Sequence, residues 1–185
     1  MNTYKADLTI RSCPEFLHGL ADSFTFQSFV EWESKLTEWE KLSEEKYQTI
    51  NITLESADDQ EIAVLYATLF AVDGIYKDNL EDWMEWEEQG NDTEDCAKLY
   101  YLLTENGCDF EDAITRIKDV YLSDESLEAT VEEFMSDCYF TKKTDPIFKR
   151  YFNYVAYGQD LLDFGDWVQF AFCGRKYICI NATSL

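Results

Sequence analysis

Glycine, proline and histidine are scarce in this sequence, which has seven Gly, two Pro and one His among 185 residues. So few Gly and Pro residues argue against a loop-rich or low-complexity chain. A single histidine, His18, argues against a histidine-based metal or catalytic centre. The six cysteines form no C-x-x-C pair, so we expect reduced, mostly buried thiols instead of a zinc site. We therefore expect no cofactor and no metal.

Long apolar runs are also missing. The longest mostly apolar run covers residues 62–72, and it is too short to span a bilayer, which takes about 20 residues. Residues 1–13 contain no apolar core of signal-peptide length. These patterns predict a cytoplasmic protein that does not associate with membranes.

Basic residues are few as well, because 15 Lys and Arg stand against 38 Asp and Glu, for a net charge of −23. This balance argues against direct binding to DNA or RNA, since phosphate contacts need Lys and Arg. The excess of negative charge is concentrated between Glu55 and Asp137, a stretch with 25 acidic residues and four basic ones. The rest of the chain is almost neutral, so the sequence has an acidic middle between two balanced ends.

The acidic middle also has the apolar residues of a folded segment. Disorder needs low hydrophobicity together with high charge, whereas this stretch contains, among others, Leu65, Phe70, Leu80, Trp83, Met84, Trp86, Leu99, Leu102, Ile114, Val131 and Phe134. A folded scaffold that carries carboxylates at this density predicts a surface that a basic partner recognises.

The apolar periodicity predicts an α+β protein with three divisions: residues 1–55, 56–140 and 141–185. The first should contain a strand over 4–11, a short helix from Pro14 to about Asp22, a helix over 25–42 and a strand over 47–54. The middle division should be mainly helical. Its predicted helices cover residues 61–72 (with a strand as the alternative), 77–89, a segment capped by Asn91 or Asp92 and ending at about residue 105, and 109–117. An extended piece over 119–122 and a helix from Ser123 or Asp124 to about 139 should follow. The last division should contain a basic linker over 141–144, a helix over 146–162, and strands over 167–173 and 176–180 joined by a Gly174-Arg175 turn.

One segment resembles a known family. The run Tyr151-Phe-Asn-Tyr-Val-Ala-Tyr-Gly-Gln-Asp-Leu161, followed by Gly165-Asp166 and an apolar hairpin, is similar to the C-terminal segment of ArdA-type antirestriction proteins. The chain keeps six residues of the motif and departs from it at Asn153, Val155 and Gln159, where the family has Asp, Glu and Arg. The resemblance covers residues 107–180, and a fainter similarity is found in Ala6-Asp7-Leu8 and Leu17-His18-Gly19.

The resemblance implies an elongated protein of three small domains that acts as a homodimer. Members of the family imitate the phosphates of DNA with carboxylates and inhibit restriction-modification enzymes, chiefly the type I complexes. They are commonly carried by mobile genetic elements. The implied partner is thus a DNA-binding enzyme and not a nucleic acid.

Two groups of residues are candidates for this role. Carboxylates three and four residues apart share one helix face, as in the predicted rows Glu81, Asp82, Glu85, Glu88 and Asp124, Glu125, Glu128, Glu132. The full set of predicted phosphate mimics is Asp78, Glu81, Asp82, Glu85, Glu87, Glu88, Asp92, Glu94, Asp95, Asp109, Glu111, Asp112, Asp124, Glu125, Glu128, Glu132 and Glu133. The second group, expected to serve packing or dimer formation, consists of Tyr151, Tyr154, Ala156, Tyr157, Gly158, Asp160 and Leu161.

Three other function classes compete with this interpretation. An acidic inhibitor of another nucleic-acid-binding protein, such as an anti-CRISPR, would share the mechanism and differ in target. An acidic adaptor protein would bind its partner without imitating DNA. An enzyme is disfavoured, because no G-x-S-x-G, P-loop or glycine-rich fingerprint is present, and the residues from Asp78 do not follow the EF-hand pattern.

Overall fold

The computed structural model describes residues 2–10, 22–43, 47–72, 77–141 and 143–185. The chain forms two compact units, the first from Met1–Cys96 with Asp109–Glu111 and the second from Ala97–Cys108 with Asp112–Leu185. The described residues form helices and two three-stranded antiparallel sheets, which confirms the α+β class.

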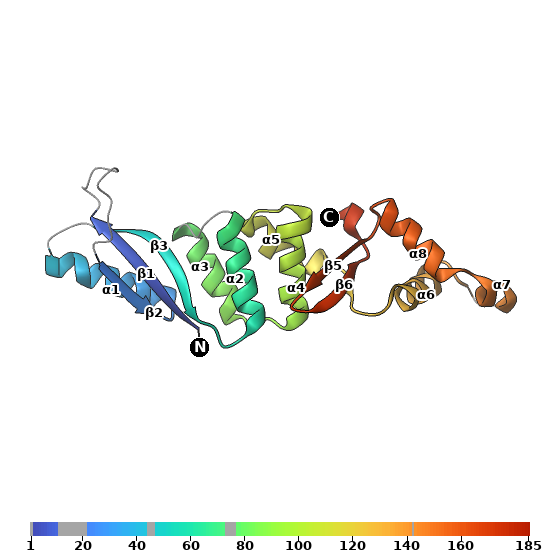
Figure 1. Cartoon of the computed structure of the whole chain (residues 1–185), viewed down its shortest axis with the longest axis horizontal. Coiled ribbons are helices and arrows are strands. Elements are labelled where there is room, and N and C mark those ends of the chain that lie inside the picture. The colour runs from blue at the N-terminus through green and yellow to red at the C-terminus, as the bar shows by residue number, and fades with distance from the viewer. Residues whose placement is uncertain (1, 11–21, 44–46, 73–76, 142) are drawn as a thin grey trace. The chain divides into compact units, whose positions relative to one another are not determined.

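The sheet of the first unit has the strand order β2-β1-β3, with β1 (Thr3–Ile10) in the centre (Figure 1). β2 (Asp22–Phe26) and β3 (Tyr47–Ser56) pair with it on either side. Alternate residues of β1 are fully buried, namely Tyr4, Ala6 and Leu8. This period of two is the pattern of a strand with one face on the core.

The described residues of the first unit include the helices α1 (Phe29–Ser43), α2 (Gln60–Val72) and α3 (Lys77–Glu88), and α4 (Thr93–Tyr101) begins there. Aromatic side chains join these helices to the sheet. Tyr4 stacks on Phe26 and also contacts Tyr66, which in turn meets Trp83 edge-on. Buried aromatic pairs contribute about 0.5–1.5 kcal/mol each beyond the area that they bury, so this cluster holds α3 rigidly against the sheet.

The sheet of the second unit has the order β4-β6-β5. β5 (Val168–Phe172) and β6 (Arg175–Cys179) form a hairpin, and β4 (Leu122–Ser123) pairs with the other side of β6. Phe170 and Phe172 are buried on one face, where they contact Tyr100 and Tyr101 at the end of α4.

The second unit also contains the helices that follow α4, except that the first two residues of α5, Phe110 and Glu111, belong to the first unit. A π-helical turn, Leu102–Asn106, ends α4 at Gly107, whose φ of 74° is favourable for glycine. α5 (Phe110–Arg116) leads into a 3₁₀ turn, Ile117–Asp119. The later helices are α6 (Leu127–Cys138), α7 (Pro146–Tyr151) and α8 (Tyr154–Asp163), and a 3₁₀ turn, Ala182–Ser184, follows the hairpin.

Several predicted elements are confirmed, including the strands over 4–11 and 47–54 and the helices over 61–72, 77–89 and 109–117. Of the two residues predicted as alternatives for the cap of α4, Asn91 and Asp92, the structure uses Asp92, whose Oδ1 accepts a hydrogen bond from Asp95 N at 2.9 Å. The predicted helix over 14–22 and His18 lie outside the described residues, except that Asp22 belongs to β2 and not to a helix.

Three other boundaries before residue 140 were wrong. The helix predicted from residue 25 begins at Phe29, because Asp22–Phe26 pairs with β1 instead. The extended piece predicted over 119–122 is a 3₁₀ turn up to Asp119 and a strand only at Leu122–Ser123. α6 is capped by Ser126, whose Oγ accepts from Ala129 N, and not by Ser123 or Asp124.

Two predictions in the C-terminal segment were also wrong. The single helix over 146–162 is two helices, since Asn153 Oδ1 accepts from Ala156 N at 3.0 Å and so caps a new helix. The hairpin turn consists of Cys173 and Gly174, with φ values of 47° and 79°, in place of Gly174-Arg175. Left-handed residues at both central positions are typical of a type I′ turn.

Candidate functional site

The predicted phosphate mimics are mostly exposed. Three of them, Asp82, Glu87 and Asp95, are half-buried, and Asp78 lies in α3 with a side chain outside the described part of the structure. The exposed members are Glu81, Glu85, Glu88, Asp92, Glu94, Asp109, Glu111, Asp112, Asp124, Glu125, Glu128, Glu132 and Glu133.

In the first unit, α3 presents a row of carboxylates to solvent because its opposite face is anchored in the core. Leu80, Trp83 and Met84 are buried on that opposite face. Glu81, Glu85 and Glu88 are exposed, and no hydrogen bond or ion pair joins their carboxylates to another described residue. With a helical rise of 1.5 Å per residue, the three charges span about 10 Å. One strand of B-DNA presents about three phosphates over the same length.

In the second unit, α6 presents a shorter row. Thr130, Val131 and Met135 are buried on one face, while Glu128, Glu132 and Glu133 are exposed. The predicted row of Asp124, Glu125, Glu128 and Glu132 does not lie on one helix, because Ser126 caps α6 and the first two residues precede it. The two residues are exposed but are not held in the helical spacing.

Glu87 differs from the rest of α3 because internal donors hold its carboxylate. Tyr4 Oη donates a hydrogen bond to Glu87 Oε2 at 2.6 Å, and Asn2 Nδ2 donates to Oε1. Trp83 Nε1 donates to Tyr4 Oη at 2.8 Å, so a chain of donors ends at Glu87. Burial raises the pKa of the Glu87 carboxyl, and the hydrogen bond from Tyr4 opposes this shift. Glu87 thus fixes β1 to α3 and is less available to a partner than its neighbours.

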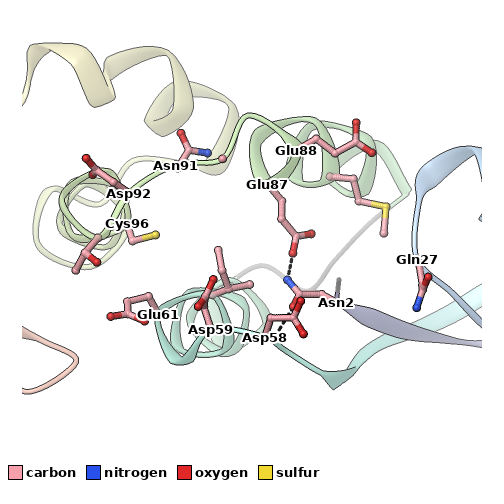
Figure 2. A pocket seen from close by; sticks show the side chains of 14 residues that line it. Asn2, Gln27, Asp58, Asp59, Glu61, Glu87, Glu88, Asn91, Asp92 and Cys96 are labelled. Carbon is pink, nitrogen blue, oxygen red and sulfur yellow. Dashed lines mark hydrogen bonds between the residues drawn. The ribbon is translucent and has the colours of Figure 1, made fainter.

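A pocket of about 450 Å³ opens beside Glu87 (Figure 2). α2, α3, α4 and the residues next to them contribute six carboxylates to its lining: Asp58, Asp59, Glu61, Glu87, Glu88 and Asp92. Asn2 lies in its wall and joins two segments, because its amide donates to Glu87 while its Oδ1 accepts from Asp58 N at 2.7 Å. The pocket is therefore an acidic hollow within the first unit, with ordinary apolar residues, Ile62, Met84 and Cys96, among its lining.

The motif segment serves packing in the second unit. Tyr154, Tyr157 and Leu161 pack against a core of Val131, Met135, Trp167 and Ile178. Gly158 is buried where α8 approaches α6, and a Cβ placed on it would lie 2.8 Å from the side chains of Leu127 and Val131. In contrast, Tyr151, Ala156 and Asp160 are exposed, Tyr151 to 79%.

Outside the acidic stretch, Lys5 pairs with Asp7 at 3.1 Å and Lys35 pairs with Glu31 at 2.6 Å. Within the described part of the chain, no group of three or more His, Cys, Asp or Glu side chains is arranged to hold a metal ion. None of the helices described has the length and apolar character needed to cross a bilayer.

Sequence reasoning missed the pocket and the anchoring role of Glu87. The pocket brings together Asn2, Gln27 and Asp58 from distant parts of the sequence. No local sequence pattern predicts that these residues lie close together. Glu87 gave a usable signal, because it falls on the same helical stripe as Leu80, Trp83 and Met84. An acidic residue in that stripe indicates a buried hydrogen-bonding partner.

No family model matches the chain, and neither the curated proteins nor the solved structures contain a match to it.

Proposed function

We propose that this protein is a DNA mimic that inhibits a DNA-binding defence enzyme, with a type I restriction-modification complex as the target. In this proposal the exposed carboxylates occupy the positions at which the enzyme binds DNA phosphates. The alternatives are an acidic inhibitor of a different nucleic-acid-binding protein and an acidic adaptor that imitates no nucleic acid.

The observation that carries the proposal is the row on α3. Glu81, Glu85 and Glu88 are exposed, are not neutralised by described neighbours, and are held on a helix whose opposite face is buried. Solubility alone needs a net charge of about 2–8 for a small domain, whereas this chain has a net charge of −23. Charges held on a rigid scaffold lose little entropy on binding, so the row is suited to pairing with Arg and Lys in a preformed groove.

The pocket supports the same kind of partner. Its carboxylates surround a hollow in which the side chain of a partner's arginine or lysine has room to sit. Field lines concentrate in clefts lined by charges of one sign. A basic surface is therefore attracted to the same unit that carries the α3 row.

A binding measurement with matched variants tests the proposal. The purified type I complex is titrated with the protein, with its Glu81→Gln/Glu85→Gln variant, and with a Glu33→Gln/Glu38→Gln control. The control removes the same charge from exposed positions on α1, outside the acidic stretch. We expect the α3 variant to bind about ten-fold more weakly, which is about 1.4 kcal/mol, and the control to bind like the wild type.

Salt and DNA complete the test. Binding should weaken steeply as the salt concentration rises, and duplex DNA should compete for the same site. A complex that tolerates high salt and added DNA, or an equal loss in the α3 and α1 variants, would refute the mimic and favour the adaptor. In cells, unmodified phage should plate better on a restricting host that expresses the protein.

A further inference from the structure

The short helix α7 presents large apolar side chains to solvent (Figure 1). Ile147 is 66% exposed, Phe148 is 54% exposed and Tyr151 is 79% exposed. Tyr151 follows the other two at spacings of three and four residues, which bring side chains onto one face of a helix. These three residues form the α7 patch. Neighbouring apolar side chains that stay uncovered on a soluble protein usually mark an interaction site.

α7 is fixed to the second unit by ring contacts and a hydrogen bond. The rings of Phe140, Phe148 and Phe152 contact one another, with centroids 5.9 to 6.1 Å apart. Phe140 and Phe152 in turn pack against the core of the unit. Tyr154 Oη donates a hydrogen bond to the carbonyl of Lys149 at 3.0 Å. The patch is therefore held in place before any partner arrives, and a preorganised surface loses little entropy on binding.

The segment around the patch has the opposite charge to the rest of the chain. Residues 139–155 contain four basic residues and one acidic residue, whereas the rest of the chain contains 11 basic and 37 acidic ones. The acidic residue, Asp145, is engaged as the cap of α7. No ion pair between described residues involves Lys143, Lys149 or Arg150. Their positive charges are thus available to an acidic partner.

We propose that the α7 patch docks a short amphipathic helix of another protein. The apolar face of that helix covers Ile147, Phe148 and Tyr151, and its Asp and Glu side chains lie beside the basic residues of the segment. A helix fits better than an extended peptide, because α7 has no strand edge and offers no ladder of main-chain hydrogen bonds. A partner helix satisfies its own backbone and brings an apolar stripe with the same spacing.

The charge of the whole molecule argues for a small acidic partner over a large one. A nucleic acid or an anionic membrane carries many negative charges and meets the repulsion of the acidic stretch. A short helix with a few carboxylates interacts mainly with charges within about 8 Å at physiological salt, and those are the basic ones. A second copy of the chain would bring the same basic residues to the patch, so two-fold pairing there would place like charges together.

A designed peptide tests the chemistry of the partner. The probe is a fluorescently labelled amphipathic peptide of about 14 residues, or four helical turns, with Leu on one face and Glu on both flanks. A second peptide has Gln in place of each Glu. Fluorescence anisotropy should show the Glu peptide binding several-fold more tightly than the Gln peptide, and added salt should weaken it. If the overall charge of −23 dominates instead, the Glu peptide will bind more weakly than the Gln peptide and salt will strengthen its binding, which would overturn the proposal.

A matched pair of aromatic variants locates the apolar contact. Tyr151→Ala should weaken binding of the Glu peptide about ten-fold, the loss expected of a central contact residue. Phe164→Ala is the control, because it removes a ring that is 80% exposed in the same unit but outside the patch. Its affinity should equal that of the wild type, and equal losses in the two variants would contradict the assignment. Circular dichroism and fluorescence of the buried Trp167 confirm that each variant is folded.

A second pair of variants locates the charge contact. Lys143→Glu/Arg150→Glu should abolish the preference for the Glu peptide over the Gln peptide. Lys118→Glu/Arg175→Glu makes the same change in net charge at exposed positions outside the segment and should keep the preference. A preference that is lost in both variants would mean that net charge, and not the α7 patch, governs binding.

The same proteins distinguish the other occupants of the patch. A labelled single-stranded oligonucleotide and phosphatidylserine vesicles should not bind, and sedimentation velocity should give the same result for the wild type and Tyr151→Ala. Binding to either anion that depends on Tyr151, or self-association that Tyr151→Ala abolishes, would overturn the proposal in favour of that occupant. The Glu81→Gln/Glu85→Gln variant should bind the Glu peptide like the wild type, so the failure of this proposal and that of the DNA-mimic proposal can be told apart.

Discussion

Gly158 is the position at which a single methyl group tests the packing of the second unit. In an unconstrained helix, replacing Gly by Ala stabilises the helix by about 1 kcal/mol. In α8, however, the new Cβ would lie 2.8 Å from Leu127 Cγ and Cδ1 and 2.8 Å from Val131 Cγ2. Leu127 is half-buried and can turn aside, but Val131 is fully buried, and side chains in a closely packed interior have little room to move. Overpacking of this kind costs about 1–3 kcal/mol.

The balance of the two effects predicts that Gly158→Ala lowers the free energy of unfolding by about 1 kcal/mol. If the second unit unfolds as a cooperative unit of roughly 60–100 residues, the loss corresponds to a decrease in its Tm of about 4–8 °C. Urea denaturation followed by circular dichroism measures the first quantity and calorimetry the second. Ala156→Gly, at an exposed position in the same helix, is the control and should lose about 1 kcal/mol through helix propensity alone.

A double variant separates the steric contact from other effects. Val131→Ala creates a space beside Gly158, so the added methyl group of Gly158→Ala should fit into it. The two losses should therefore be less than additive, with a coupling of about 1 kcal/mol. If Gly158→Ala instead stabilises the protein by about 1 kcal/mol, α6 and α8 are not in close contact and the packing described for the motif is incorrect.

Three further variants probe the hydrogen bonds of the two units. Burial raises the pKa of Glu87 in the folded protein, while in the unfolded chain it is the ordinary glutamate pKa of about 4.3. At pH values between these two pKa values, Glu87 is protonated in the folded protein and ionised in the unfolded chain. The free energy of unfolding should therefore fall as pH rises through this window and level off above it. Urea titrations of Glu87→Gln should not show this fall. Equal pH profiles for the wild type and the variant would contradict the assignment. Tyr4→Phe removes the hydroxyl that accepts from Trp83 Nε1 and donates to Glu87 Oε2, while Asn2 still donates to Oε1. The variant should cost about 1–3 kcal/mol, whereas an unchanged midpoint would mean that solvent replaces the hydroxyl. Asn153→Ala removes the cap of α8 and should cost about 1 kcal/mol, with Asn153→Asp as a variant that retains stability.

Local patterns predicted the elements that depend on neighbouring residues. The stripe of Leu80, Trp83 and Met84 identified α3 together with its exposed acidic face, and the polar pair Asn91 and Asp92 marked the start of α4. The break at Asn153 was also local, because asparagine favours caps over helix interiors. It was missed because apolar residues continue on both sides of it.

Elements that depend on distant residues were not predictable in the same way. β2 forms because β1 offers it a partner, with Tyr4 opposite Phe26, and the sequence of β2 alone fits the start of a helix equally well. The pocket depends on Asn2 and Asp58, which are brought together by the fold. The turn at Cys173 was misplaced because a left-handed backbone is uncommon for any residue other than glycine, asparagine or aspartate.

The position of β6 between β4 and β5 has a consequence for synthesis of the protein. β4 ends at Ser123 and its only described strand partner begins at Arg175, so the ribosome adds about 50 residues between the two. At a translation rate of about 5–20 residues per second, β6 is synthesised several seconds after β4. During that interval the apolar face of α6 has neither Ile178 nor Trp167 to cover it. The second unit therefore matures late in translation, and chaperones that bind exposed apolar helices have their best opportunity to engage the nascent chain at that stage.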